Sequence, residues 1–302
     1  MEANINRRAS PIEVPAEQTS FAQFPTAVLP ALLWFTLLLI VLYLPVLTSM
    51  VREWAEEEEM GHGFFVPVVA GAIIWREWGK LLLIPIKPFY PAVLFIILGF
   101  GVSLLGSLGA DFFLARVGFV IALYGVVWTL TGTALVKQLI FPFFLLLFMI
   151  RMPLFIYSQI TFPLQLFASA VAEHALNFIG IPVFRDGNIL ELASRKLSVV
   201  EACSGIRSLI SLSFLSLVYG YYFDSKKWMR WALLASTVPI AIFANAGRVT
   251  LTGIISVMKA EFADGFYHSL EGGAVFMFAL IALVLTHQVI NRSYQAFSGR
   301  KA

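Results

Sequence analysis

Residues 90–109 read Y-P-A-V-L-F-I-I-L-G-F-G-V-S-L-L-G-S-L-G, a stretch without one charged side chain. A transmembrane helix needs about 20 predominantly apolar residues to cross the hydrocarbon core of a bilayer. The rest of the chain resembles this stretch, because 59% of its 302 residues are hydrophobic and 13% are charged. A soluble domain has about 25% charged residues. The sequence therefore predicts an all-α polytopic membrane protein.

Further apolar stretches bring the predicted number of transmembrane helices to about eight. Six are long and nearly free of charge, and they cover residues 28–49, 90–109, 112–132, 205–223, 229–246 and 270–290. Two are interrupted: residues 63–78 contain Pro67, and residues 134–150 contain Lys137 and Pro142. We expect all eight to cross the membrane.

The segment between the fifth and sixth predicted spans has a different character. Residues 153–180 are apolar but include Gln165 and Glu173, so we expect a helix at the membrane surface or against protein, not a span. Asp186-Gly187-Asn188 is a turn signal, and alternating apolar and polar residues follow it. This pattern predicts a short hairpin before the sixth span.

Lysine and arginine in the short loops predict the orientation, because such residues favour the cytoplasmic side. They stand in every second loop, at Arg7, Arg8, Arg76, Lys80, Lys87, Lys137, Lys226, Lys227, Arg230, Arg292, Arg300 and Lys301. Both termini would then be cytoplasmic, and the hairpin and the acidic run at residues 56–59 would be solvated on the outer side. We expect one membrane domain (28–291) between cytoplasmic tails (1–27 and 292–302), in the inner (cytoplasmic) membrane.

The single cysteine, Cys203, stands where the outer segment enters the sixth span, in V-E-A-C-S-G-I-R-S at residues 200–208. Ser204 and Gly205 suit a helix cap, so the thiol would lie near a helix N-terminus. Backbone N–H groups and the positive end of the helix dipole would favour its thiolate. Arg207, four residues after the cysteine, would share its helix face.

Two further reactive side chains return to the outer side by this topology. The seventh span runs outward to N-A-G-R at residues 245–248, and His268 precedes the last inward span. A thiolate can attack a peptide carbonyl, an imidazole can transfer the proton, and the Arg248 guanidinium can stabilise the oxyanion. The arrangement favours acyl-transfer chemistry at the outer surface.

These segments resemble the exosortase/archaeosortase family of membrane cysteine transpeptidases. The matching stretches are E-A-C-S-G-I-R-S-L (201–209), A-N-A-G-R (244–248), Y-H-S-L-E-G (267–272), G-I-P-V-F-R-D-G-N-I-L (180–190) and H-G-F-F-V-P (62–67). The resemblance covers roughly residues 28–291, and it implies a catalytic triad of Cys203, Arg248 and His268. We assign supporting roles to Ser204, Arg207 and Asn245.

The resemblance also implies a substrate class. Exported proteins with a C-terminal PEP-CTERM-type tail, made of a short motif, a hydrophobic helix and a basic end, would be cleaved through a thioester at the periplasmic or outer face. The family accompanies exopolysaccharide production, so that machinery and membrane lipids are the other expected partners. No nucleic-acid partner is expected, because basic clusters with interleaved aromatics are absent from the sequence. No cofactor or metal is expected either, because His62, His174 and His287 lack ligand-spaced companions.

Other interpretations stay open from the residues alone. Cys203 could be an inert small apolar residue, Arg248 a helix-end anchor and His268 a plain interfacial histidine. An intramembrane serine hydrolase could use Ser204, although Ala202 replaces the first glycine of a G-x-S-G motif. A transporter or assembly scaffold is the non-enzymatic alternative, but transporters more often place ionisable groups near the bilayer midplane.

Overall fold

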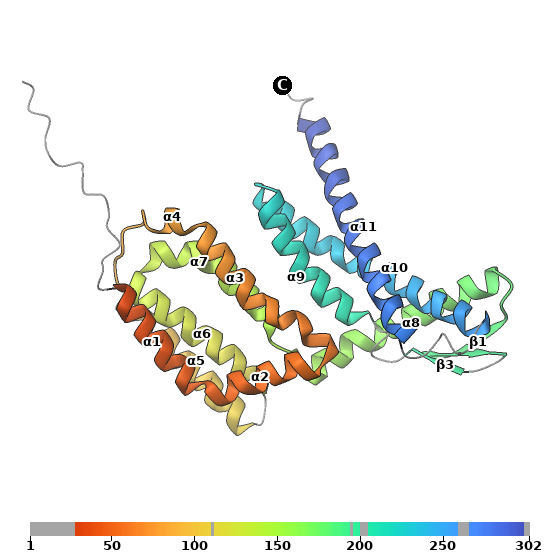
Figure 1. Ribbon diagram of the computed structural model, residues 1–302, viewed down its shortest axis with the longest axis horizontal. Coiled ribbons are helices and arrows are strands. Elements are labelled where there is room, and N and C mark those ends of the chain that lie inside the picture. The colour runs from red at the N-terminus through yellow and green to blue at the C-terminus, as the bar shows by residue number, and fades with distance from the viewer. Residues whose placement is uncertain (1–27, 110–111, 194–195, 200–204, 259–265, 299–302) are drawn as a thin grey trace, which may run out of the picture.

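The computed structural model describes residues 28–109, 112–193, 196–199, 205–258 and 266–298 (Figure 1). The predicted tail 1–27 lies outside these residues. Helices make up nearly all of the described chain, which confirms the predicted all-α fold. The first group of elements is α1 (Val28–Leu42), α2 (Leu44–Glu56), η1 (Glu58–Phe64), α3 (Phe65–Arg76), α4 (Trp78–Leu81), η2 (Tyr90–Ala92), α5 (Val93–Leu108), α6 (Phe112–Thr131), α7 (Thr133–Leu146) and η3 (Leu147–Met149).

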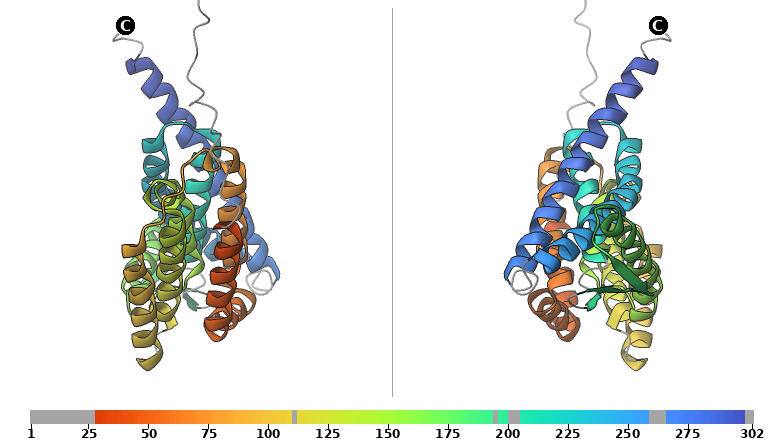
Figure 2. Two further views of the ribbon diagram at one scale, coloured as in Figure 1. Left: turned by 90° about the vertical axis from the view of Figure 1, so that its left-hand side faces the viewer. Right: turned by 90° about the vertical axis from the view of Figure 1, so that its right-hand side faces the viewer.

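The second group follows η3 and holds the predicted site. Its elements are α8 (Leu154–Phe178), β1 (Val183–Asp186), β2 (Ile189–Leu192), β3 (Lys196–Ser198), α9 (Ile206–Phe223), α10 (Lys227–Met258) and α11 (Phe266–Ser298). Figure 1 shows the two groups beside each other, with α9 nearest the first group, and Figure 2 shows the molecule from the side of each group. Phe214 and Leu217 of α9 are buried in the same apolar cluster as Met149 and Ile150, so the groups share a core.

Six described helices are long and apolar enough to cross a membrane, or up to seven spans if the bent pair of α1 and α2 counts as one. The prediction of eight spans is therefore not confirmed. Two of the expected spans are short: α3 has 12 residues, and α7 with η3 covers Thr133–Met149. Hydropathy reports the apolar character of a segment but not its type of helix. It therefore does not show that the first residues of the expected span 63–78 belong to the 3-10 helix η1.

The bend between α1 and α2 has a local cause. The two helices meet at an angle of 73°, and Pro45 occupies the first turn of α2. Proline has no N–H to donate to the preceding turn, so an α-helix breaks there. The hydroxyl of Tyr43, at the break, donates to the carbonyl of Gly99 on α5 (3.3 Å).

Helices α5 and α6 pack closely through glycine. A Cβ atom at Gly99 would stand 2.6 Å from the backbone of Gly118, and one at Gly118 would stand 2.5 Å from the carbonyl oxygen of Gly99. Small residues allow helix backbones to approach in lipid, where packing replaces the hydrophobic effect as the driving force. The two helices therefore form a closely packed pair in the first group.

The predicted hairpin is present and gains a third strand. β1 pairs with β2 in antiparallel register, with Asp186 opposite Ile189, and β2 pairs with β3. Gly187, in the turn, has a φ of +61°, a conformation that glycine adopts without a Cβ penalty. Leu190 of β2 is fully buried against α8 and α10.

Helix α8 differs from its prediction in one respect. It satisfies the length and composition required of a span, although we expected a helix at the membrane surface or against protein and not a span. Several of its polar side chains contact the hairpin: the Ser169 hydroxyl is bonded to the carbonyl of Gly187 (3.2 Å), and the Asn188 amide donates to Gln165 (3.2 Å). Glu173 accepts from Arg185 of β1 (2.9 Å), so both polar residues that argued against a span, Gln165 and Glu173, contact the hairpin.

Opposite ends of the molecule differ in charge. The hairpin and the start of α9 lie at one end, here called the hairpin end, and α4 and the α9–α10 turn lie at the other (Figure 1). The end that holds α4 and the α9–α10 turn is here called the basic end. One cavity there is lined by four basic residues: Lys80, Lys137, Lys227 and Arg230. The clustering agrees with the expected alternation of basic loops.

At the basic end, polar contacts join α9 to α11. His287 is buried and lies between the Tyr219 hydroxyl (3.0 Å) and the Asp224 carboxylate (3.1 Å). Burial raises the pKa of Asp224, but hydrogen bonds from the Lys226 backbone and from His287 outweigh it, so the pKa lies below its ordinary value. His287, expected as a plain residue inside, is thus a structural link.

Candidate active site

The start of α9 is fixed by Gly205. This residue is the helix N-cap, as expected, and its φ of +78° lies in the left-handed region. An L-residue with a side chain rarely adopts that conformation, and glycine does so freely. Helix α9 therefore begins at Ile206, directly after this residue. Cys203 lies outside the described residues, and so does its expected helix-face relation to Arg207.

A second feature of Gly205 is its contact with α10. A Cβ atom built on it would stand 2.8 Å from both Cβ and Cγ of Asn245, closer than real side chains approach. Asn245 is itself 5% exposed. The missing side chain thus lets the N-cap residue of α9 lie against the N-A-G-R segment of α10.

One turn further along α10, Arg248 meets α11. Its guanidinium nitrogen Nη2 lies 3.4 Å, and its Cζ 3.5 Å, from the place that a Cβ atom on Gly272 would occupy. Arg248 is half-buried there. Asn245 and Arg248 are three residues apart and share a helix face, so one face of α10 contacts both neighbouring helices.

The other two expected triad members, Cys203 and His268, each precede one of the two contacting glycines in the sequence. Cys203 stands two residues before Gly205, and His268 stands four residues, about one helical turn, before Gly272. Cys203 and Ser204 lie outside the described residues. His268 belongs to the first turns of α11, but its side chain is outside the described set. The structure therefore places Gly205 and Gly272, which are near Cys203 and His268 in the sequence, against the face of α10 that carries Asn245 and Arg248.

The chain also matches a known protein family. A family model described as transmembrane exosortase matches residues 54–285, which include the segments around Cys203, Arg248 and His268. The chain belongs to the transmembrane exosortase family. No curated protein and no solved structure matches it.

The exosortase has an apolar cavity beside this region. The cavity, here called the outer cavity, measures about 480 Å³ and lies between the first group and α9 and α10. Its apolar walls include Phe148, Ile156, Ile210 and Leu234, and Arg207 lines it near the start of α9. Arg207, which the sequence placed next to the thiol, therefore borders a space large enough for several apolar side chains.

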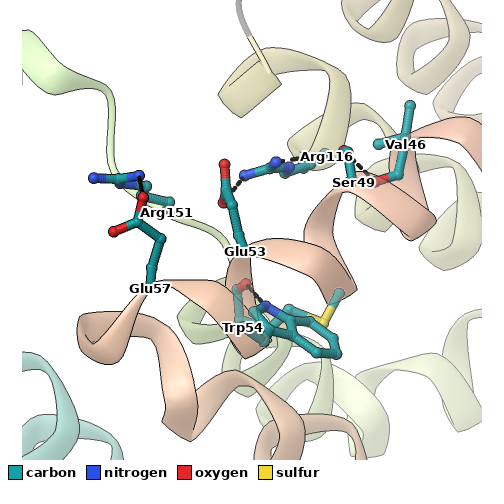
Figure 3. A network of polar contacts seen from close by, with 8 residues as sticks. Val46, Ser49, Glu53, Trp54, Glu57, Arg116 and Arg151 are labelled. Carbon is teal, nitrogen blue, oxygen red and sulfur yellow. Dashed lines mark hydrogen bonds and ion pairs between the residues drawn. The ribbon is translucent and has the colours of Figure 1, made fainter.

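The acidic run of the exosortase is not simply a solvated loop. Figure 3 shows Glu57 paired with Arg151 (3.1 Å) and Glu53 paired with Arg116 (2.5 Å). The Tyr157 hydroxyl, at the start of α8, donates to Glu59 (2.6 Å). These contacts tie α2 and η1 to α6 and α8. Local spacing does not reveal these partners, because they are about 60 to 100 residues away.

Two other histidines occupy different environments. His62, expected as a loop residue, lies in η1, where its Nε2 is 3.0 Å from the carbonyl oxygen of Phe148. Burial lowers the pKa of His62 more than this carbonyl raises it. His174 is exposed on α8. Among the residues that the structure describes, no three His, Cys, Asp or Glu residues lie close enough to hold a metal ion.

Proposed function

We propose that this exosortase is a cysteine transpeptidase or protease with Cys203 as nucleophile. The observation that carries the proposal is the contact of one face of α10 with both Gly205 and Gly272. These glycines are two and four residues from Cys203 and His268, so short stretches of chain separate both reactive residues from Arg248. The hairpin end, which is opposite the basic end, would face the periplasm.

The proposed reaction has two steps. The Cys203 thiolate attacks a peptide carbonyl, the Arg248 guanidinium stabilises the oxyanion, and collapse breaks the C–N bond as the amine takes a proton from His268. The acyl group is then held as a thioester. An acceptor amine or water, deprotonated by His268, attacks the thioester carbonyl and releases the thiolate.

We further propose that the substrate is an exported protein with a PEP-CTERM-type tail, linked to exopolysaccharide export. The apolar walls of the outer cavity suit part of a hydrophobic helix, because transmembrane helices associate through packing. Arg207 would lie where that helix reaches the surface and would contact the sorting motif. Asn245 would position the start of α9, and Ser204 would support the nucleophile.

The test is the processing of a reporter with such a tail in membranes that contain the wild-type enzyme, Cys203→Ala or Ser204→Ala. We expect the shortened product with wild type and Ser204→Ala, and none with Cys203→Ala at an equal membrane level. Hydroxylamine should release an acyl group trapped on the wild-type enzyme. Normal processing by Cys203→Ala would overturn the cysteine mechanism and point to Ser204.

A further inference from the structure

A large cavity lies at the basic end, far from the proposed site. It measures about 750 Å³ and lies between α3, α4, α7, α9 and α10. We call it the inner cavity. Its charged lining consists of Glu77, Lys80, Lys137, Lys227 and Arg230. Four cations and one carboxylate give it a net positive charge.

Only one of these cations has a carboxylate partner among the described residues. Lys80 pairs with Glu77 at 2.6 Å. This contact lowers the pKa of Glu77 most, and a hydrogen bond from Tyr221 lowers it further. No carboxylate in the described ranges lies within ion-pair distance of Lys137 or Lys227. The cavity therefore has positive charge that the described chain does not neutralise.

Arg230 is held in place without a counter-ion among the described residues. Its guanidinium lies over the rings of Tyr221 (4.7 Å) and Phe141 (5.0 Å). Its Nε is buried and has no hydrogen-bond acceptor in the described part of the chain. The two rings stack on each other with their centroids 5.3 Å apart, and a cation held against both can bind an anion at little further cost in side-chain entropy.

The other walls of the inner cavity are apolar. They include Ile73, Leu81 and Phe144, and the cavity reaches the outer surface of the helices at Ile140 and Trp231, which are 52% and 56% exposed. In a membrane protein, such exposed apolar residues face lipid. Tryptophan is also typical of the boundary between hydrocarbon and headgroups. The space therefore combines a cationic part with an apolar part that opens to the bilayer.

We propose that the inner cavity binds an anionic phospholipid of the cytoplasmic leaflet. The phosphate would lie among Lys137, Lys227 and Arg230, and an acyl chain would lie along the apolar wall beside Trp231. Basic pockets between transmembrane helices on the cytoplasmic side bind anionic headgroups in this way. A free phosphate ion would use the cations but not the walls, and the basic end of a substrate tail would be repelled.

The experiment compares lipid binding to the purified full chain by native mass spectrometry, with phosphatidylglycerol and phosphatidylcholine. We expect stronger binding of phosphatidylglycerol, and a loss of about tenfold for the double variant Lys137→Gln/Arg230→Gln. The single variant Lys137→Gln, at an exposed position, should show part of the loss if the double variant folds poorly. Arg292→Gln, an exposed basic residue on α11 outside the cavity, is the matched control and should bind normally.

Three results would overturn the proposal. Equal binding of both lipids would show that charge is not recognised. An equal loss with Arg292→Gln would show a diffuse surface effect in place of a site. Displacement of the lipid by inorganic phosphate alone would show that the site takes a free anion. None of these results depends on peptide processing, so the proposed enzyme function is tested separately.

Discussion

At the scale of single residues, the candidate site depends on glycines that allow close approach. Gly205 contacts Asn245 and Gly272 contacts Arg248, whereas a Cβ atom added to Gly247 or Gly273 would meet nothing within 4 Å. Gly247, on α10, can therefore serve as the control for Gly205, and Gly273 can serve as the control for its neighbour Gly272. A substitution at Gly247 or Gly273 removes a glycine without a collision. Comparison with Gly205 or Gly272 therefore isolates the effect of the collision.

Gly205→Ala should destabilise the start of α9. Alanine at a positive φ costs about 1–2 kcal/mol, and its Cβ would also collide with Asn245. We expect a lower thermal midpoint in detergent and loss of reporter processing. Gly247→Ala, in the interior of α10, should be neutral or stabilising by about 0.5–1 kcal/mol. A Gly205→Ala variant that melts and processes like wild type would contradict the described contact.

Gly272→Leu should act on the reaction more than on the fold. A leucine side chain would push the Arg248 guanidinium away, and a displacement of about 1 Å can reduce the rate about 100-fold. Gly273→Leu faces open space and should process the reporter normally. The measurement is the initial rate of processing at matched membrane levels. Equal rates for the two variants would argue against a role for Arg248 at this position.

At the scale of elements, a buried ion pair joins α2 to α6. The Arg116 side chain is 3% exposed and lies beside the Glu53 carboxylate at 2.5 Å, with Ser49 as a further contact. Its Nε is buried without an acceptor among the described residues. Removal of one partner from such a pair leaves a charge that neither water nor protein compensates.

Glu53→Leu should therefore destabilise the first helix group by about 3 kcal/mol or more, and the double variant Glu53→Leu/Arg116→Met should recover most of that loss. The thermal midpoints of both variants in detergent give the comparison. Arg52→Leu is the control, because its contact with Glu56 is long (3.9 Å) and exposed, and it should change little. A double variant no more stable than Glu53→Leu would show that the pair is not a self-contained unit.

At the scale of the whole molecule, η1 lies at the junction of the two helix groups. His62 bonds to the Phe148 carbonyl of η3, and its ring lies near Phe214 of α9. Trp54 at the end of α2 donates to the carbonyl of Met149 (2.9 Å; Figure 3). A change of charge at His62 therefore acts on the contact between the groups.

Acid should weaken this junction. Because burial lowers the pKa of His62 below its ordinary value of 6.5, the unfolded chain takes up a proton in a range where the folded chain does not. The free energy of unfolding then falls as the pH drops below 6.5 and stops falling below the folded pKa. We expect the difference in thermal midpoint between about pH 7.5 and about pH 5 to shrink in His62→Gln. His174→Gln, an exposed histidine, should keep the wild-type difference.

Several features of the fold could be predicted from the sequence, because they depend on local composition and spacing. The long apolar helices, the turn at Gly187 and the cap at Gly205 follow from hydropathy and turn chemistry. Errors occurred where a partner far away in the chain decides the outcome. The polar residues of α8 indicated a helix at the membrane surface or against protein and not a span, but the helix has the length and composition of a span, and two of its polar side chains bond to the hairpin. The acidic run indicated a solvated loop, but two of its four members, Glu57 and Glu59, contact Arg151 and Tyr157.

The sequence by itself determined the class of the protein, its family motifs and the identity of the expected reactive residues, because apolar length and residue type are written along the chain. Only the tertiary structure decided that one face of α10 contacts the starts of both α9 and α11, and that basic side chains from separate helices gather in the inner cavity. In both features, residues that are 24 to 150 positions apart in the sequence lie close together in space. Hydropathy and local spacing contain no information on such distances.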